Sequence, residues 1–410
     1  MLVIDNVDLE YEGPSKDEQG YDPGGVIPDA DHGSVLITTR LAGRARLRDS
    51  LHLGHVNDVE AKAILQSSAK KPLQDVDVLL RRLNGLPLAL TQAGAYIGRT
   101  CIDVSTYIRH FDGTWSDLMR KQDRFPLQEY AQRSMLTTWK ISYEQVSWQS
   151  KAAASLLKLW AFFSPDDVWY GLIASALEIG DEVETPAWLT DLATDDLEFA
   201  DAVGLLTAYS LVEGKAENAG YTMHSVLHKW CELLCVEEGD GPLFQVLCAC
   251  MLGVSVPSSV VRSEYWKTDW RLLPHIMHMW SKREKAEVPA WMEIPAWALH
   301  SMAESFHRQG QLREAKWMYE QALAGREKAL GPEHTSTLHT VNNIGNLYKN
   351  RGKLDEAEKM YERAVAGREK ALGSEHTSTL LTVNNLGNLY KDQEKLDEAE
   401  KMYERALRKS

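Results

Sequence analysis

A long repeat at the C-terminal end of the chain constrains its fold more than any other feature. The segment Gly331–Leu338 (GPEHTSTL) returns as Gly373–Leu380 (GSEHTSTL), which sets a period of 42 residues. When 331–368 is aligned with 373–410, 28 of the 38 positions are identical. Small residues and Leu or Tyr side chains recur at helical spacing within each copy. A repeat of this length predicts a solenoid of stacked helical hairpins.

The same register continues one period earlier, so the array starts near Trp297. Its pattern of small, Leu and Tyr positions resembles the tetratricopeptide repeat (TPR). The run Arg326–Gly331 (REKALG), after the second helix, is similar to the kinesin light chain variety. The resemblance implies an α-solenoid of about three repeats over residues 297–410, and hence a mainly α chain.

In the TPR family the first helix of each pair lines a peptide-binding groove. The likeness places six polar side chains there: Asn342, Asn346, Lys349, Asn384, Asn388 and Lys391. Their offsets of four and three put each set of three on one helix face. Amide and ammonium groups suit an extended peptide, because Asn both donates and accepts and Lys meets a carboxylate. A solvated polar face is the alternative interpretation.

The last predicted helix ends at Arg408–Ser410 with a repeat-like apolar face and no cap after it. Solenoids normally end in a polar cap. We therefore expect either self-association through this end or a natural protein that continues further.

Two short segments rich in β-branched residues, 1–8 and 33–40, predict buried parallel strands. Together with Leu83–Leu90 (LNGLPLAL) and Tyr221–Ser225 (YTMHS), they resemble the NB-ARC module of fungal-type STAND signalling NTPases, which are NLR-like proteins. The resemblance divides the chain into a partial nucleotide core (1–50, a remnant of a P-loop NTPase α/β sheet with the Walker B and sensor strands), a helical subdomain (51–120), a winged-helix-like domain (130–240), a helical bridge (241–296) and the repeats (297–410).

Four positions match nucleotide-site residues of that family. The likeness makes Asp5 the Walker B ligand of a nucleotide-bound Mg²⁺, which prefers oxygen ligands. Arg40 matches the sensor arginine at the terminal phosphate, and His224 matches the histidine that contacts the diphosphate. Pro87 matches a proline beside adenine, although a proline at a helix start explains it as well. For Arg40 the alternative is an exposed arginine after a strand.

Other positions depart from the family. Asn6 stands where a second acid positions the attacking water, and an amide cannot act as a general base. Ser225 replaces an aspartate. No Gly-x-x-x-x-Gly-Lys-Ser/Thr loop is present, and in the family the strand before that loop lies between the two strands predicted here. We therefore expect no nucleotide cofactor and no enzymatic activity for this chain, and ADP or ATP with Mg²⁺ in a full-length form.

A zinc site is an alternative interpretation of His224, His228, Cys231 and Cys235, which share one helical face. With a rise of about 1.5 Å per residue, the outermost pair would lie roughly 16 Å apart. Zinc ligands lie only about 2 Å from the metal. The spacing therefore favours a buried helix face.

Composition limits the partners. The chain has 45 basic and 59 acidic residues, a net charge of −14, and no dense basic cluster in 135–235, which opposes binding of DNA by a winged helix. No segment resembles a membrane span or a signal peptide. Five cysteines without zinc spacing predict free thiols and a cytoplasmic location.

The resemblances imply a truncated NLR-like signalling protein of the kind that acts in innate immunity or heterokaryon incompatibility. Its TPR array would bind a protein or peptide, and its complete form would be an ADP/ATP-controlled assembly switch. The alternative is a nucleotide-independent TPR adaptor with a structural N-terminal half.

One helix start can also be predicted from local residues, because Asn57 with Glu60 three residues later is typical of a capped helix start.

Overall fold

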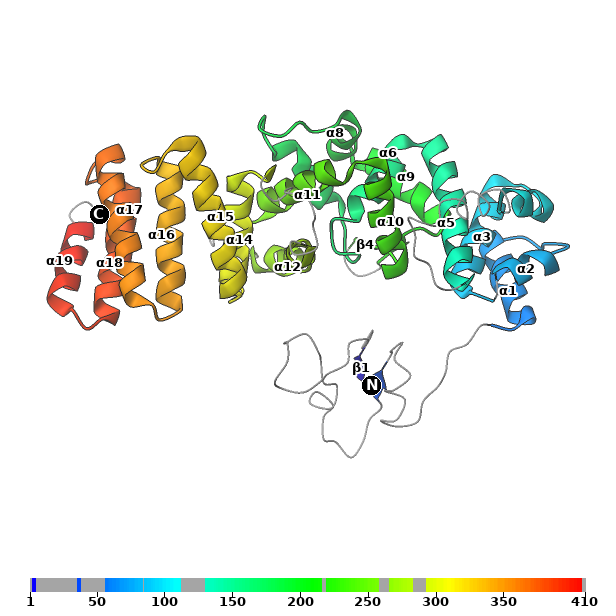
Figure 1. Ribbon diagram of the computed structural model, residues 1–410, viewed down its shortest axis with the longest axis horizontal. Helices are drawn as coiled ribbons and strands as arrows, with labels where there is room; N and C mark the ends of the chain where they lie inside the picture. The colour runs from blue at the N-terminus through cyan, green and yellow to red at the C-terminus, as the bar shows by residue number, and fades with distance from the viewer. Residues whose placement is uncertain are drawn as a thin grey trace. The chain divides into compact units, whose positions relative to one another are not determined.

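The protein is described by a computed structural model that covers residues 2–4, 35–37, 56–83, 85–111, 130–215, 219–257, 265–282 and 293–407. Most of these residues are helical, which confirms the predicted mainly α fold (Figure 1). The chain divides into two compact units, Met1–Val56 and Asn57–Ser410. Within the described part, no helix is both long enough and apolar enough to cross a membrane.

The first unit contains two short strands, β1 (Leu2–Ile4) and β2 (Val35–Ile37). They pair in parallel, with Leu2 opposite Val35, which confirms the predicted direction. In the family resembled, a further strand lies between the equivalent two strands, whereas β1 and β2 are direct neighbours here. Direct pairing satisfies the backbone groups that each strand would otherwise leave open. The predicted site residues Asp5 and Arg40 lie outside the described residues.

The second unit begins with three helices, α1 (Asp58–Ala69), α2 (Asp77–Leu83) and α3 (Pro87–Thr100). The predicted helix start is confirmed as a capping box: Asn57 Oδ1 accepts from Glu60 N at 3.0 Å, and Glu60 accepts from Asn57 N at 3.1 Å. Gly98 lets α3 approach α1 closely, because a Cβ there would lie 2.6 Å from the Ala69 carbonyl oxygen. A further helical stretch covers 104–111.

The middle of the chain packs around helix α6. The elements in order are α5 (Tyr130–Gln149), α6 (Lys151–Trp160), α7 (Tyr170–Ala174), the short 3₁₀ helix η4 (Ser175–Glu178), α8 (Ala187–Thr194), α9 (Asp196–Ala208), β3 (Glu213–Gly214), β4 (Tyr221–Thr222) and α10 (Ser225–Glu238). Helix α6 contacts α5, α8, α9 and α10, and its Trp160 is fully buried. β3 and β4 form a small antiparallel hairpin. The winged-helix assignment of this region stays a prediction.

Two helices link this region to the repeats: α11 (Gly241–Ser255) and α12 (Tyr265–Lys282). Gly253 of α11 lies against helix α14 (Ala296–Arg308) so closely that a Cβ there would be 2.8 Å from the Ala298 Cα. On α12, the buried Asp269 accepts two hydrogen bonds from Arg308, at 2.6 and 2.8 Å. The repeats are therefore packed onto the bridge by both apolar and charged contacts.

Three helical hairpins follow, and each packs on the next (Figure 1). They are α14 (Ala296–Arg308) with α15 (Leu312–Leu330), α16 (Thr335–Asn350) with α17 (Leu354–Leu372), and α18 (Thr377–Asp392) with α19 (Leu396–Leu407). Tyr361 is fully buried among Ala357, Val383 and Leu389. Gly345 lets α16 approach its partner, because a Cβ there would lie 2.7 Å from the Tyr361 ring.

The repeated GxEHTST motif builds the turn between hairpins. Gly331 ends α15 with φ +90°, a conformation that side chains disfavour. Thr337 Oγ1 then donates to the Gly331 carbonyl at 2.8 Å, and His334 Nδ1 accepts from Ser336 N at 3.2 Å as an N-cap. Gly373, Thr379 and His376 make the same contacts one period later. The motif recurs because each residue completes one turn.

Candidate functional site

Polar side chains on the first helices α14, α16 and α18 bond to one another across neighbouring repeats. Four contacts join them: Asn343 Nδ2 to Glu304 Oε1 (2.8 Å), Asn350 Nδ2 to His307 Nε2 (2.8 Å), Asn385 Nδ2 to Asn342 Oδ1 (3.1 Å), and Lys349 Nζ to Asp392 Oδ2 (3.1 Å). We call this row of contacts the first-helix ladder. It fixes each first helix relative to the next.

Two of the six predicted groove residues belong to this ladder. Asn342 is only 7% exposed and bonds to Asn385 and Asn343. Lys349 forms an ion pair with Asp392. The Asn342 side chain therefore holds the adjacent repeat, and a role for it in a groove stays a prediction.

The other four predicted residues lie nearer the surface. Asn346 accepts a hydrogen bond from the Tyr361 hydroxyl at 2.6 Å, and Asn388 accepts one from Tyr403 at 2.9 Å. Both asparagines are half-buried, as is Asn384, whereas Lys391 is exposed. The tyrosine fixes each amide by its oxygen, so the amide nitrogen is directed away from the tyrosine. These two pairs lie one repeat apart in equivalent positions.

A second row of contacts holds each second helix to the following first helix. The buried Arg326 donates to the Ser336 carbonyl at 2.8 Å and to Thr340 Oγ1 at 2.7 Å. Arg368 repeats this arrangement with Ser378 and Thr382. The arginine of the REKALG run is thus structural. It satisfies backbone and hydroxyl groups that the helix packing buries.

The described residues include only two of the four predicted nucleotide-site positions. Pro87 is exposed at the first turn of α3, where its fixed φ suits a helix start. His224 is exposed just before α10, and its carbonyl accepts from His228 N at 2.9 Å. The nucleotide roles of Asp5, Arg40, Pro87 and His224 stay predictions.

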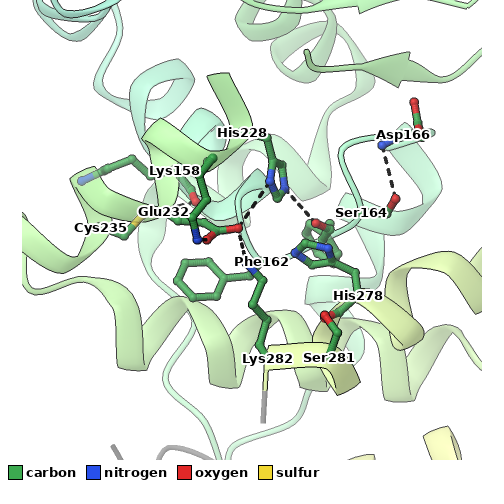
Figure 2. A network of polar contacts seen from close by, with 12 residues as sticks. Lys158, Phe162, Ser164, Asp166, His228, Glu232, Cys235, His278, Ser281 and Lys282 are labelled. Atoms are coloured by element: carbon green, nitrogen blue, oxygen red, sulfur yellow. Dashed lines mark hydrogen bonds and ion pairs between the residues drawn. The ribbon is translucent and has the colours of Figure 1, made fainter. Parts of the chain in front are cut away.

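Helices α10 and α12 meet at a polar network that the sequence did not predict. Figure 2 shows His228 and Glu232 of α10 converging with His278 and Lys282 of α12. His228 Nε2 lies 2.9 Å from the Phe163 carbonyl oxygen, and its Nδ1 lies 3.5 Å from Glu232. Burial raises the pKa of Glu232, but its ion pairs with Lys229 and Lys282 outweigh that effect and hold the pKa below its usual value. The network joins the two helices.

The thiols of α10 are structural. Cys231 and Cys235 are buried, and the Cys235 Sγ donates to the Lys158 carbonyl at 3.5 Å. Burial raises the pKa of Cys235 to about 12, so the group is a protonated thiol at neutral pH. A thiolate is the form that binds zinc.

Two groups of His and Glu side chains in the described part bring ligand atoms within 4.8 Å of one another: His228, Glu232 and His278, and His300, Glu304 and His339. The set suggested by the sequence, His224 with His228, Cys231 and Cys235, is not one of them. Both groups contain a His and a Glu four residues apart on one helix. That spacing was available in the sequence, but the third residue comes from another helix.

Comparisons with known proteins agree with the repeat assignment. Residues 295–370 and 337–409 match the tetratricopeptide repeat family. The chain is 25% identical over 373 residues to a nucleotide-binding leucine-rich repeat (NLR)-like protein of Hyaloscypha variabilis, an alignment that covers 83% of this chain and 34% of that protein. The chain thus spans about a third of the length of this relative.

Two solved structures are similar to parts of the chain. One contains the kinesin light chain nearly identical TPR-like repeats of Podosopora anserina, with 18% identity, a TM-score of 0.33, and coverage of 52% of this chain and 86% of that one. Another is BtubC (BKLC) of P. vanneervenii, with 18% identity, a TM-score of 0.34, and coverage of 58% and 88%. The C-terminal part of this chain is a TPR array, and the chain is similar to an NLR-like protein over most of its length.

Proposed function

We propose that the TPR array binds a protein partner through the face of its first helices that carries Asn346, Asn388 and Lys391. The observation that supports this proposal is the pair of Tyr–Asn contacts, Tyr361 with Asn346 and Tyr403 with Asn388. Each tyrosine holds an amide in one orientation before any partner arrives. Groups ordered in advance lose less conformational entropy on binding.

The chemistry of this face suits an extended peptide. An amide nitrogen donates to a backbone carbonyl, and the exposed ammonium of Lys391 meets a carboxylate. A net charge of −14 makes a protein a better candidate partner than a nucleic acid. The partner we propose is therefore a segment of protein with backbone groups and at least one acid exposed.

A double substitution tests this face. Asn346→Asp with Asn388→Asp keeps an oxygen to accept from each tyrosine but removes both amide donors. We expect the partner's Kd to rise roughly 30-fold, since two lost hydrogen bonds of about 1 kcal/mol each add to about 2 kcal/mol. Quantitative mass spectrometry of proteins captured by the immobilised chain would identify the partner, and surface plasmon resonance would measure the Kd.

A control variant has the same change in net charge. Lys359→Ala with Lys401→Ala alters exposed residues of the second helices, also one period apart. It should leave the Kd unchanged. Equal weakening by the two double variants would contradict the proposed face, provided that circular dichroism shows both variants to be folded.

We further propose that the chain is part of an NLR-like signalling protein whose complete form assembles under control of ADP and ATP. The similarity to an NLR-like protein supports this proposal, as do the resemblances at Asp5, Arg40, Pro87 and His224. In this proposal the N-terminal half is the switch and the TPR array selects the partner. We do not assign the chain an enzymatic activity, because Asn6 cannot act as a general base.

The nucleotide prediction concerns residues 1–410 alone. Titration with ADP and Mg²⁺ in a calorimeter should give no saturable heat, because residues 1–410 contain no phosphate-binding loop. In P-loop proteins that loop supplies the amide cradle, the lysine and a Mg²⁺ ligand. Submicromolar binding would contradict this prediction. For the full-length protein, assembly that ignores nucleotide would favour a TPR adaptor with a structural N-terminal half.

A further inference from the structure

Three residues on the first helices of the first two hairpins, His300 and Glu304 on α14 and His339 on α16, differ from their equivalents in the following repeat. By the period of 42 residues, His300 and Glu304 of α14 correspond to Asn342 and Asn346 of α16. His339 corresponds to Leu381, although α16 and α18 are otherwise almost the same helix. Between 335–350 and 377–392 only three positions differ, and the other two exchanges are Ile for Leu and Asn for Asp. At these three positions, imidazole and carboxylate groups therefore stand where the following repeat has two amides and a leucine.

These three side chains converge from two neighbouring first helices. His300 is 4% exposed, and its Nε2 lies 3.4 Å from Glu304 Oε1 one turn further along α14. The ring of His339 lies 4.8 Å from that of His300, measured between centroids. One ligand atom from each of the three residues falls within 4.8 Å of the other two. Ligands of tetrahedral zinc at about 2.0–2.1 Å are roughly 3.3 Å apart, so small side-chain rotations suffice.

We propose that His300, Glu304 and His339 form a binding site for a divalent transition metal ion, with zinc as the best match. Two imidazoles and one carboxylate are a common set of three protein ligands for zinc, and they leave a fourth position open. His339 is exposed, so that position is accessible to water or to a group from a partner. The site would join α14 to α16 through the metal.

Arginine side chains of α14, α15 and α17 lie around the site, and each of them is held by another group. Arg308 lies near Glu304 but is held by Asp269 of α12. Arg326 of α15 and Arg368 of α17 point their guanidinium groups at the Ser336 and Ser378 carbonyls. Asn343 donates to Glu304 Oε1 at 2.8 Å, which orients the carboxylate as a second-layer contact does in known metal sites.

In the other His and Glu group, His228 with Glu232 and His278, lysine side chains occupy the carboxylate that a metal ion would need. Glu232 of that group is ion-paired with Lys229 and Lys282, so two ammonium groups already balance its charge. At Glu304 the corresponding contacts come from the neutral Asn343 amide and from His300. Of the two groups, only the one in the repeats leaves its carboxylate without a lysine. This difference is why we assign the metal site to α14 and α16.

The test uses the full chain, freed of metal with a chelator, and titrates it with ZnCl2 in a calorimeter. Cobalt chloride serves as a second probe, because tetrahedral Co²⁺ absorbs visible light. His339→Leu introduces the residue that α18 carries at Leu381, so the fold should be kept. We expect it to weaken the site at least about 100-fold, as loss of a direct ligand exceeds the effect of an outer contact. Glu304→Gln, which retains hydrogen bonding, should weaken it at least about tenfold.

Leu381→His is the matched control. It adds an imidazole at the equivalent position of α18. The neighbouring helix α16 carries Asn342 and Asn346 where α14 carries His300 and Glu304, so this variant should gain no additional tight zinc binding. One zinc per chain in the wild type, lost in His339→Leu, supports the site. The proposal is overturned if the wild type binds no zinc below about 10 μM, a Kd that corresponds to about 7 kcal/mol. It is also overturned if His339→Leu binds as the wild type does, since the zinc then lies elsewhere.

Discussion

Replacing Tyr361 by alanine should lower the free energy of unfolding of the repeat array by about 3–5 kcal/mol, the usual cost of removing a large buried aromatic side chain. Tyr361 is fully buried against Ala357, Val383 and Leu389. Its ring also fills the space beside Gly345, so the substitution would leave a cavity between α16, α17 and α18. Urea denaturation followed by circular dichroism would measure the change.

Two further variants show which part of the tyrosine matters. Tyr361→Phe removes only the hydrogen bond to Asn346 and should cost about 0.5–1.5 kcal/mol. Tyr403→Ala alters the equivalent residue of the last hairpin, which is half-buried, so it should cost less than Tyr361→Ala. An equal loss of stability for Tyr361→Ala and Tyr403→Ala would show that burial by the next hairpin does not determine the effect.

Adding a single methyl group at Gly253 should destabilise the joint between the bridge and the repeats by about 1–3 kcal/mol, as overpacking of a close contact does. The new Cβ would lie 2.8 Å from Ala298 Cα and 3.0 Å from Ala298 Cβ. Because the first of these atoms is backbone, α11 and α14 must move apart to accept it. Differential scanning calorimetry of Gly253→Ala would detect a lower or divided transition.

Gly204 provides the matched control, since it lies within helix α9 and a Cβ there would meet nothing within 4 Å. Gly204→Ala should therefore raise stability by about 0.5–1 kcal/mol through helix propensity alone. If both substitutions were stabilising, the close approach of α11 to α14 would not restrict the space at Gly253.

Features that depend on neighbours along the chain could be predicted from the sequence. The period of 42 residues predicted the hairpins, because small and apolar residues recur at helical spacing within it. Gly331 and Gly373, one period apart, each end a second helix. Asn57 and Glu60 predicted a capping box from a spacing of three. Pro87 begins α3, as its interpretation as a proline at a helix start predicts.

Features that depend on contacts between distant residues could not be predicted. Asn342 looked like a ligand contact, yet it is buried because Asn385, 43 residues later, lies against it. Nothing near Glu304 in the sequence indicates that His339 meets it. Asp269 and Arg308 come from separate helices, and neither lies in a recognisable motif. In each case the partner is set by how the helices stack, which the repeat period alone does not give.

The rows of contacts between hairpins have a mechanical consequence. The first-helix ladder ties one side of the array, and ion pairs from Arg363 to Glu327 and from Arg405 to Glu369 tie the second helices. Bending the array either way would strain one row, and several contacts of about 0.2–1 kcal/mol would yield together. The array should therefore resist bending. A partner whose shape matches the curvature of the unbound array can bind without deforming the array. A partner of another shape must bend the array at a cost in free energy, so the rigidity of the array contributes to its choice of partner.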